Sequence, residues 1–351
     1  MSSAVTVNTN GSSFTVLQTI GLASILLGVG IASYTYLTAE QVVGMKVHSG
    51  FIDEDKKVLV VEEAAPRAEK TVSSSSTSTT HSAPNSIKAR LADKQKVSPD
   101  TVMLTFVFPN GDGKVIPVGK HLKVFCPNPN PQKDALWNGA PDPEAGKPTV
   151  ERKYTPVSST EQGFVLVVKA YRPNEKFASG GKVSQYLADR EVGDDIEVAM
   201  PFGIMEYLTN GNFKKSKSVF PAKFVGMVAG GSGITPMLRL LEASLADDTD
   251  PTKFSLIFAN RSEHDIILRS RLDELAKKHS NRFKVAYTLT RPPEGWKGGV
   301  GLVTQDMIKQ HMPPNHESTL ILCCGPPQMI KTCCKDNLER LGYSNQQIWD
   351  F

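Results

Sequence analysis

Charged residues are missing from the start of the chain. The first 39 of its 351 residues contain no Asp, Glu, Lys or Arg, and residues 14–37 (FTVLQTIGLASILLGVGIASYTYL) are mostly apolar. A helix of this length is sufficient to span about 30 Å of hydrocarbon. A cleaved signal peptide is the alternative, but it has a positively charged start and a shorter apolar region. We therefore expect residues 1–40 to form a membrane anchor, with one helix over about 14–37.

A strong charge of one sign and a disulfide framework are also lacking. The formal net charge is +4 and no basic run occurs, so we expect no nucleic-acid partner. The five cysteines are an odd number without the spacing of a secreted framework, which indicates reduced thiols. The adjacent pairs Cys323–Cys324 and Cys333–Cys334 do not have the C-x2-C spacing of zinc ligands. We interpret them as small buried hydrophobic residues and expect no metal.

A polar segment succeeds the apolar one. Residues 41–85 include most of VSSSSTSTTHSAPNS (72–86), which is low in complexity and predicts a flexible linker. Lysines at positions 46, 56 and 57 favour the cytosolic side for the part of the chain after the apolar run, although acidic residues lie among them. The expected location is therefore a membrane with the remaining chain in the cytosol. The endoplasmic reticulum and the outer mitochondrial membrane both remain open.

Residues 86–205 contain short runs rich in Val, Phe and Ile, separated by Pro and Gly. This pattern is typical of an antiparallel β-barrel or sandwich. One helix is expected over 182–190, and the Pro- and Gly-rich stretch 127–148 is expected to be an exposed loop. The expected strands lie within 101–109, 121–127, 163–171 and 194–203.

The remainder of the chain changes its hydrophobic period. After an expected linker at 206–221, residues 222–351 alternate strand-like and helix-like segments, which predicts a parallel sheet covered on both faces. Such sheets bind ligands at the carboxyl ends of their strands. The expected strands lie in KFVGMVA, KFSLIFANR, FKVAYTLT and TLILCCG.

A glycine-rich turn, GGSGITP (230–236), ends the first of these strands. We expect Thr235 to cap the next helix and Pro236 to occupy its first position. Gly231 and Gly233 leave the backbone open there, which suits either a cofactor or tight packing. The turn does not match G-x-G-x-x-G, so a plain dinucleotide-binding dehydrogenase is disfavoured.

Two polar motifs lie in the expected barrel. RKYTPVSS (152–159) places Arg152 and Tyr154 on one face of a strand and Thr155 on the other. A planar heterocycle with a diphosphate tail would use all three side chains. GGKVSQYL (180–187) begins a helix with two glycines, a lysine and a serine, which suits a second phosphate contact.

These motifs, together with FANRSEHDIILR (258–269) and CGPPQM (324–329), resemble those of ferredoxin-reductase-like flavoproteins, within them the NADH–cytochrome b5 reductase family. The resemblance covers about residues 87–351. It implies an FAD-binding β-barrel followed by an NADH-binding α/β domain, with the flavin between them.

The resemblance also implies roles around FAD. Arg152 would pair with the diphosphate, Tyr154 would lie against the flavin, and the Thr155 hydroxyl would sit near N5, the hydride acceptor. His121, in GKH, would relay a proton with Thr155, and a packed strand histidine is the alternative. The rest of the implied FAD site is Pro156, Val157, Ser158, Lys169, Tyr171, Gly181, Lys182, Val183 and Ser184.

On the NADH side, the resemblance places Thr235 at the junction of flavin and nicotinamide. Cys324, Pro326 and Met329 would line the nicotinamide side, with Cys324 a positioning residue rather than a nucleophile. Asp265 would accept from the adenosine ribose and favour NADH over NADPH. A helix N-cap is the alternative for this aspartate, and both roles are compatible. The turn residues Gly231, Gly233 and Pro236 complete the implied site.

The implied reaction moves a hydride from NADH to FAD and then single electrons to cytochrome b5, by a monomer. Lys120, Lys176 and Lys182 are candidates to steer an acidic partner. One alternative is another acceptor, such as an oxygenase, a desaturase or a quinone. A second alternative is a membrane-tethered protein without catalytic activity.

Overall fold

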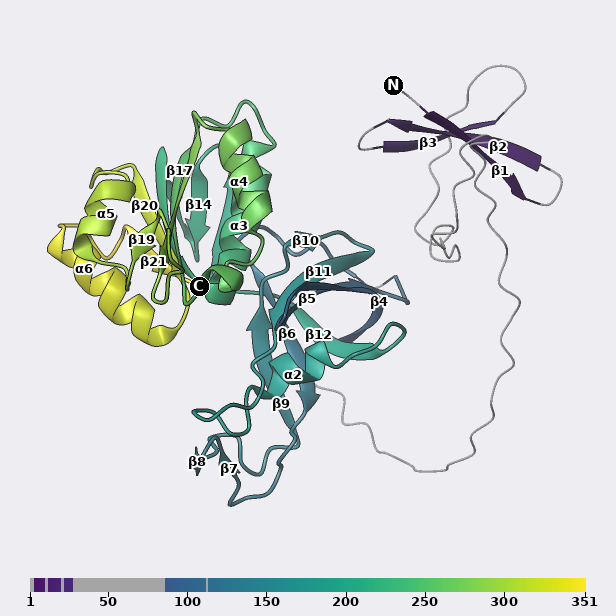
Figure 1. Ribbon diagram of the computed structural model, residues 1–351, viewed down its shortest axis with the longest axis horizontal. Coiled ribbons are helices and arrows are strands. Elements are labelled where there is room, and N and C mark those ends of the chain that lie inside the picture. Colours follow the sequence, from purple (N-terminus) through teal and green to yellow (C-terminus); the bar gives the residue numbers. More distant parts are fainter. Residues whose placement is uncertain (1–2, 10–11, 20–21, 28–85, 112) are drawn as a thin grey trace. The chain divides into compact units, whose positions relative to one another are not determined.

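The computed structural model describes residues 3–9, 12–19, 22–27, 86–111 and 113–351. The chain divides into two units, Met1–Thr79 and Thr80–Phe351. In the first unit, three antiparallel strands pair in the order β1-β2-β3 (Figure 1). Their bounds are β1 (Ser3–Thr9), β2 (Ser12–Thr19) and β3 (Leu22–Leu27).

The membrane helix expected over 14–37 is not found in the described part of that range. Strands β2 and β3 occupy most of 14–27, while residues 28–37 and the expected linker at 41–85 lie outside the described residues. Residues such as Thr15, Val16 and Thr19 favour extended backbone, because branching at Cβ restricts their side chains in a helix. Nowhere in the described ranges does a helix reach the length and apolarity that crossing a membrane requires.

The second unit begins with a seven-stranded antiparallel sheet in the order β10-β11-β5-β4-β12-β6-β9. Six of these strands contribute side chains to a single core, and Val183 and Leu187 of helix α2 (Lys182–Ala188) join it. Because the sheet curves around this one core, it forms the barrel that the sequence predicts. The strands are β4 (Ile87–Ser98), β5 (Thr101–Val107), β6 (His121–Pro127), β9 (Thr149–Tyr154), β10 (Ser158–Ser159), β11 (Gly163–Lys169) and β12 (Asp195–Phe202).

The stretch expected as an exposed loop is folded against the barrel. It contains a small hairpin of β7 (Leu136–Trp137) and β8 (Ala140–Pro141). Asn128 and Asp142 in this stretch are buried, with relative exposures of 6% and 7%. Most other residues of the stretch are exposed, as predicted, so the difference lies in these two buried polar side chains.

The segment expected as an interdomain linker at 206–221 forms a three-stranded meander instead. Its strands are β13 (Met205–Thr209), β14 (Asn212–Lys215) and β15 (Ser218–Pro221). Asn210 and Gly211 have φ values of 50° and 71°, which suit the tight turn of a hairpin. Tyr207 and Phe213 are buried in the core of the following domain, which explains why this short segment is ordered.

The last domain is a six-stranded parallel sheet in the order β19-β18-β17-β16-β20-β21 (Figure 1). Alternate residues of its strands face opposite layers: Met227 packs in the core that includes α3, and Val228 in the core that includes α5 and α6. The elements are β16 (Phe224–Gly230), η1 (Gly231–Gly233), α3 (Ile234–Leu245), β17 (Lys253–Asn260), η2 (Glu263–Asp265), α4 (Arg269–Lys278), β18 (Phe283–Leu289), β19 (Gly299–Val300), α5 (Gln305–His311), β20 (Thr319–Cys324), the π-helical η3 (Met329–Lys335), α6 (Asp336–Arg340) and β21 (Ile348–Asp350).

The barrel and the parallel sheet share apolar packing. Val157 and Val167 of the barrel belong to the same buried cluster as Met227 and Leu241 of the last domain. A continuous apolar core resists relative rotation of the domains, since rotation would expose its surface. The barrel and the parallel-sheet domain are therefore held in a fixed relative orientation.

Candidate functional site

A cavity of about 490 Å³ lies between the barrel and the carboxyl ends of β16 and β20. Strands β17 and β20 flank β16, and ligands of open α/β sheets bind where the strand order reverses in this way. Its volume falls in the range of small-molecule sites, about 300–1,000 Å³. The lining residues are His121, Lys153, Tyr154, Thr155, Val167, Lys169, Tyr171, Ser184, Gly230, Ser232, Gly233, Thr235, Pro236, Cys324, Gly325, Pro326 and Phe351.

Much of the predicted flavin site lies on the barrel side of this cavity. Tyr154 and Thr155 come from the end of β9, Lys169 and Tyr171 from the end of β11 and the residues after it, and Ser184 from α2. Burial raises the pKa of Tyr154, so its phenol is neutral at ordinary pH. The predicted residues Pro156, Val157 and Ser158 come immediately after but do not line the cavity, and Val157 packs in the shared core.

His121 begins β6 and lines the cavity. Its ring is stacked with that of Phe202, with centroids 6.3 Å apart. Burial, followed by the charges of Lys153, Lys123 and Lys120, lowers the pKa of His121 to about 4. The imidazole is therefore neutral near pH 7 and carries one donor and one acceptor nitrogen. Its role as a proton relay remains a prediction.

The glycine-rich turn after β16 lies against the turn after β20. A Cβ at Gly233 would lie 2.3 Å from the backbone oxygen of Cys324, and Gly231 has a φ of +52°. Glycine tolerates such close approach and left-handed backbone without strain. Met329 packs beneath the turn, where a Cβ on Gly230 would lie 2.5 Å from its sulfur. Met329 therefore supports the turn but does not line the cavity.

Helix α3 begins two residues earlier than the expected start at Pro236. Its first residue is Ile234 and its N-cap is Gly233, so Thr235 is not the cap and Pro236 is the third residue. Proline is still tolerated there, because N–H groups of the first turn have no partner within the helix. The Thr235 hydroxyl donates to the oxygen of Ser232 at 3.2 Å, which fixes its side chain at the cavity wall.

Cys324 and Cys323 point to opposite sides of β20. Cys323 is buried within the layer of α5 and α6, whereas Cys324 lines the cavity with Pro326. Burial raises the pKa of the Cys324 thiol to about 12. The thiol is therefore neutral, as expected for a positioning residue, because the nucleophile in cysteine chemistry is the thiolate.

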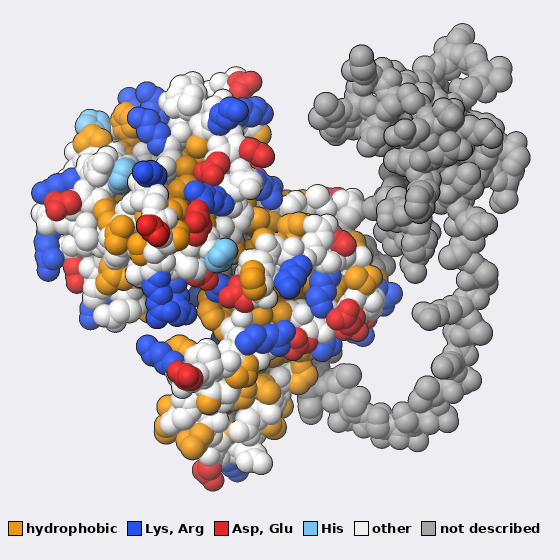
Figure 2. Space-filling model, viewed as in Figure 1, with side chains coloured by type: hydrophobic (Ala, Val, Ile, Leu, Met, Phe, Trp, Pro, Cys, Tyr) orange, Lys and Arg blue, Asp and Glu red, His pale blue; other side chains and the backbone are white. Residues whose placement is uncertain are grey.

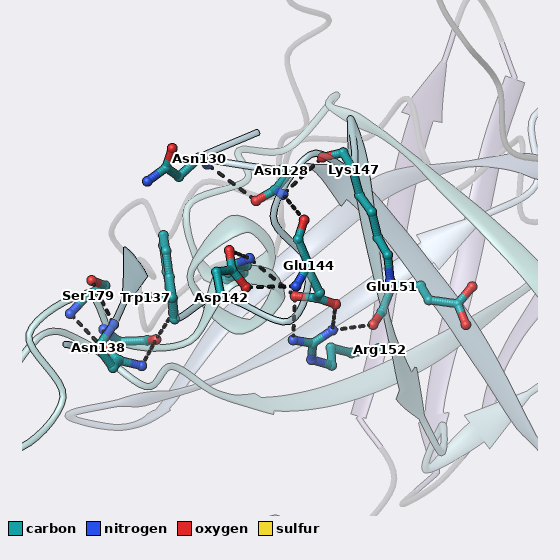
Figure 3. Close-up of polar contacts among 12 residues, drawn as sticks. Asn128, Asn130, Trp137, Asn138, Asp142, Glu144, Lys147, Glu151, Arg152 and Ser179 are labelled. Carbon is teal, nitrogen blue, oxygen red and sulfur yellow. Dashed lines mark hydrogen bonds and ion pairs between the residues drawn. The ribbon is translucent and has the colours of Figure 1, made fainter. Parts of the chain in front are cut away.

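Of the predicted diphosphate contacts, Ser184 lines the cavity, whereas Arg152 and Lys182 do not. Arg152 donates to both carboxylate oxygens of Glu144, at 2.6 and 3.0 Å (Figure 3). Lys182 pairs with Asp142 at 2.5 Å. The hydrogen bond from Arg152 is the main cause that lowers the pKa of Glu144 to about 2. The Lys182 side chain is only 2% exposed, so it is unavailable to steer a partner protein. Gly181 does not line the cavity, and the Val183 side chain packs in the barrel core.

Asp265 does not line the cavity, and it is not an N-cap. The cap of the η2 turn is Ser262, whose amide and hydroxyl bond to one Asp265 oxygen at 3.0 and 2.6 Å. The other oxygen accepts from Lys169 of the barrel at 2.9 Å. Asp265 therefore joins the two domains, and its contact with a ribose remains a prediction.

Arg239 is a functional candidate that the motifs did not reveal. This residue of α3 is 7% exposed and donates to the backbone oxygens of Pro156, at 3.3 Å, and Ile116. Burial lowers the pKa of Arg239 to about 10, so it remains charged at neutral pH. The sequence signal for such a residue is a cation among the apolar residues Met237, Leu238, Leu240 and Leu241 of the helix. It fixes the barrel against the first helix of the parallel-sheet domain.

Asn260, at the carboxyl end of β17, supports a nucleotide site. Among the described residues, both polar atoms of its buried side chain have no partner. A buried group without a partner costs about 1–3 kcal/mol, which a bound polar ligand would recover. Asn260 follows Ala259, which pairs with Gly230 in the sheet, so it lies near the glycine-rich turn. The two-sided cavity, the bare turn and this amide fit a flavin together with a nicotinamide nucleotide.

Two family models match the chain. Residues 143–207 match the oxidoreductase FAD-binding domain, and residues 227–335 match the oxidoreductase NAD-binding domain. These ranges fall in the barrel and in the parallel-sheet domain, in the predicted order. The domain models therefore assign FAD and NAD to the two sides of the cavity.

Complete relatives agree with the domain models. NADH-cytochrome b5 reductase 2 of Xenopus laevis is 45% identical over 264 residues, covering 72% of this chain and 83% of that protein. NADH-cytochrome b5 reductase 3 of Rattus norvegicus is 42% identical over 273 residues, covering 75% and 85%. The solved cytochrome b5 reductase domain of Ulva prolifera nitrate reductase has a TM-score of 0.67 and 35% identity, covering 76% of this chain and 97% of that one. The chain therefore belongs to the NADH–cytochrome b5 reductase family and is an NADH-dependent FAD oxidoreductase.

Proposed function

We propose that this protein transfers a hydride from NADH to FAD and then delivers single electrons to cytochrome b5. The observation that carries this proposal is the cavity, where Tyr154 and Thr155 of the barrel line one side and Gly233 and Thr235 the other. Hydride transfer requires the reacting atoms to approach within about 3–3.5 Å, and two walls from different domains provide the means to stack two rings. When bound, FAD supplies the conversion of a two-electron reduction into single-electron release.

The residues of this chain orient the rings and exclude water. Thr155 and Tyr154 line the cavity, where the Thr155 hydroxyl would donate a hydrogen bond at the flavin edge and the neutral Tyr154 phenol would lie against the ring. Gly233 allows the nicotinamide to approach backbone, while the neutral Cys324 thiol and Pro326 pack beside it. His121, which lines the same cavity as Thr155, would pass on a proton from the Thr155 hydroxyl by accepting it at one ring nitrogen and releasing one to solvent from the other, so that the ring stays neutral.

Cytochrome b5 is the proposed acceptor because the relatives are named for it. Of the predicted steering residues, Lys176 is exposed, whereas Lys120 is half-buried and donates to the oxygen of Gly203 at 2.7 Å. Basic and acidic side chains are interspersed on the face shown in Figure 2. Steering by a few lysines is therefore more consistent with this face than attraction by one broad basic patch.

The test mixes the purified protein with NADH and cytochrome b5 and records the haem spectrum. We expect the haem to be reduced, and to stay oxidised when NADH is omitted. Ferricyanide serves as a control acceptor that needs no docking surface. Reduction of ferricyanide but not of the haem would indicate another acceptor, such as an oxygenase, a desaturase or a quinone. A colourless protein that stays colourless after FAD is added would instead support a non-catalytic tethered protein.

We also propose that residues 1–40 attach the protein to the endoplasmic reticulum or outer mitochondrial membrane, with the second unit in the cytosol. The support is the charge-free start of the chain and its long apolar run. A variant lacking residues 1–40 should leave the membrane fraction and still reduce ferricyanide. A variant that stays with the membranes would refute this attachment.

A further inference from the structure

The loop between β6 and β9 (residues 128–148, here the β6–β9 loop) is docked on the turn that precedes α2. The Asn138 side-chain oxygen accepts from the amides of Ser179 and Gly180 at 2.7 and 2.9 Å, and its nitrogen donates to the Gly180 oxygen at 3.1 Å (Figure 3). The Trp137 indole donates to the same oxygen at 2.8 Å. Because these bonds involve both the tip of the loop and the backbone before α2, they specify one placement of the loop.

Asp142 holds Lys182 beneath this loop. Their side chains are both 2% exposed and meet at 2.5 Å, and the ammonium also lies 4.9 Å from the centre of the Trp137 ring. A second carboxylate, Glu144, lies 3.2 Å from the same ammonium. A buried lysine without these partners would be costly, because a charge out of water must be compensated. The loop therefore determines where the Lys182 charge lies.

The Glu144 carboxylate binds the two terminal nitrogens of the Arg152 guanidinium. Nη1 and Nη2 donate to the two oxygens of Glu144, and Nη1 also donates to the backbone oxygen of Glu151 at 2.6 Å. Asn128 in turn fixes the Glu144 backbone by donating to its oxygen at 3.0 Å. The Nε–H and one Nη2–H form a second fork on another edge of the guanidinium, and neither is required by Glu144. Arg152 is therefore oriented by the loop and still able to bind an anion.

We propose that Glu144 is a positioning residue for FAD, which orders Arg152 before the diphosphate arrives, and that the buried pair of Asp142 and Lys182 holds in place the loop that carries Glu144. This inference rests on the proposed function, with the FAD diphosphate at Arg152 as the family resemblance implies. Long cationic side chains lose rotamer freedom when they bind a ligand. If the loop has already ordered them, FAD binding does not bear this entropy loss, and the cofactor is retained more tightly.

The test measures FAD dissociation constants by titrating the flavin-free protein with FAD and following quenching of flavin fluorescence. For Glu144→Gln we expect about fivefold weaker binding, equivalent to about 1 kcal/mol. Asp142→Asn should also weaken binding, because it removes the buried ion pair that holds the loop carrying Glu144. Glu151→Gln is the matched control: it breaks the exposed pair with Lys123 on the neighbouring strand and should leave FAD binding unchanged.

The thermal midpoint of each flavin-free variant separates positioning from loss of structure. Weaker FAD binding at an unchanged midpoint supports the proposal, and if Asp142→Asn fails to fold, Glu144→Gln decides. Equal or tighter FAD binding by Glu144→Gln overturns it, since tighter binding would make Glu144 a competitor of the diphosphate. If Arg152→Ala retains FAD like the wild type, the placement of the diphosphate itself is wrong. A wild-type protein that binds no FAD would instead contradict the proposed function.

Discussion

The two walls of the cavity are built differently. The barrel wall carries charged side chains: Lys153 and Lys169 line it, Lys169 paired with carboxylates, and the ion-paired Arg152 and Lys182 lie beyond its edge. The opposite wall, in the parallel-sheet domain, consists of glycine backbone, Thr235, Cys324 and the prolines that flank them. Charged anchors favour long retention of an anionic cofactor, whereas an uncharged wall selects its ligand by shape and releases it more readily. The difference suits a resident FAD on one side and an exchanging NADH on the other.

Two side-chain contacts across the domain interface keep the two walls together. Arg239 donates from the parallel-sheet domain to backbone oxygens of the barrel, and Lys169 of the barrel pairs with Asp265 of the parallel-sheet domain. These contacts cross the interface in opposite directions. The relative position of the two walls is thus determined by side chains that are outside the recognised motifs as well as by those within them.

The largest effect is expected from closing the bare turn. In Gly233→Val the added atoms would collide with the Cys324 backbone, which cannot move without displacing β20. We expect flavin reduction by NADH to become about 100-fold slower, as a misplacement of about 1 Å can cause. FAD should remain bound, because the barrel wall is unchanged. Anaerobic stopped-flow measurement of flavin absorbance tests both statements.

Gly295→Ala provides the control for this substitution. Gly295 has a left-handed φ of +77°, but a Cβ there would meet nothing within 4 Å. The substitution should cost only the backbone strain of a non-glycine residue, about 1 kcal/mol of unfolding free energy. If both variants reduced flavin at the same rate, the close approach at Gly233 would not matter for NADH.

On the barrel wall we expect a comparably large effect on FAD binding rather than on the rate of flavin reduction. Arg152→Ala removes a charge-assisted contact worth about 1.5–3 kcal/mol, so FAD should bind about 10- to 100-fold more weakly. Once saturated with FAD, the variant should be reduced by NADH at nearly the wild-type rate. Equilibrium titration followed by stopped-flow reduction at saturating FAD separates the two. A slow reduction that excess FAD cannot restore would contradict the division of labour between the walls.

A smaller effect, on coenzyme preference, is expected at Asp265, which joins the two domains. Asp265→Ala should narrow the preference for NADH over NADPH about tenfold, because a carboxylate at the ribose would repel a 2′-phosphate. The measurement is the ratio of kcat/KM for the two coenzymes. Asp100→Ala is the control, because Asp100 also pairs with Lys169, at 2.6 Å, but lies in the barrel. An equal change in both variants would assign the effect to Lys169 rather than to the ribose.

The sequence predicts both domains and most of the cavity wall, because motifs and hydrophobic periods are local. It does not reveal which distant groups pair. Lys182 and Asp142 are 40 positions apart, and Arg239 reaches Pro156 across 83 positions. Hydrophobic periodicity indicates that such side chains are buried but not what they contact. For this reason the prediction of an exposed β6–β9 loop is confirmed for most of its residues but misses Asn128 and Asp142, which are buried and paired.

Short or ambiguous segments account for the remaining differences. The meander at 206–221 has strands of four or five residues, too short for an alternating pattern to stand out from a linker. An apolar run such as 14–37 fits a helix by its length, but its β-branched residues also fit the strands found over its described part. In both places local propensity fits two secondary structures, a linker or short strands at 206–221 and a helix or strands at 14–37.

The smallest expected effect concerns the neutral histidine on the barrel wall. Since the pKa of His121 is about 4 in the folded protein, flavin reduction by NADH should not follow its titration between pH 8 and about 5.5. An unfolded histidine titrates near 6.5, so the unfolded chain takes up a proton first. The free energy of unfolding should therefore fall as pH decreases from about 6.5 to about 4.

In His121→Gln this loss of stability on acidification should be absent, as urea unfolding at pH 7.5 and pH 5 can show. Lys153→Met tests the cause, because Lys153 is the strongest of the charges that oppose protonation of His121. Its removal should raise the pKa of His121 by a fraction of a unit, since burial remains the larger cause. Imidazole chemical shifts followed by NMR would measure that change. A histidine that titrated near 6.5 in the wild type would mean that the barrel wall is more hydrated than its packing implies.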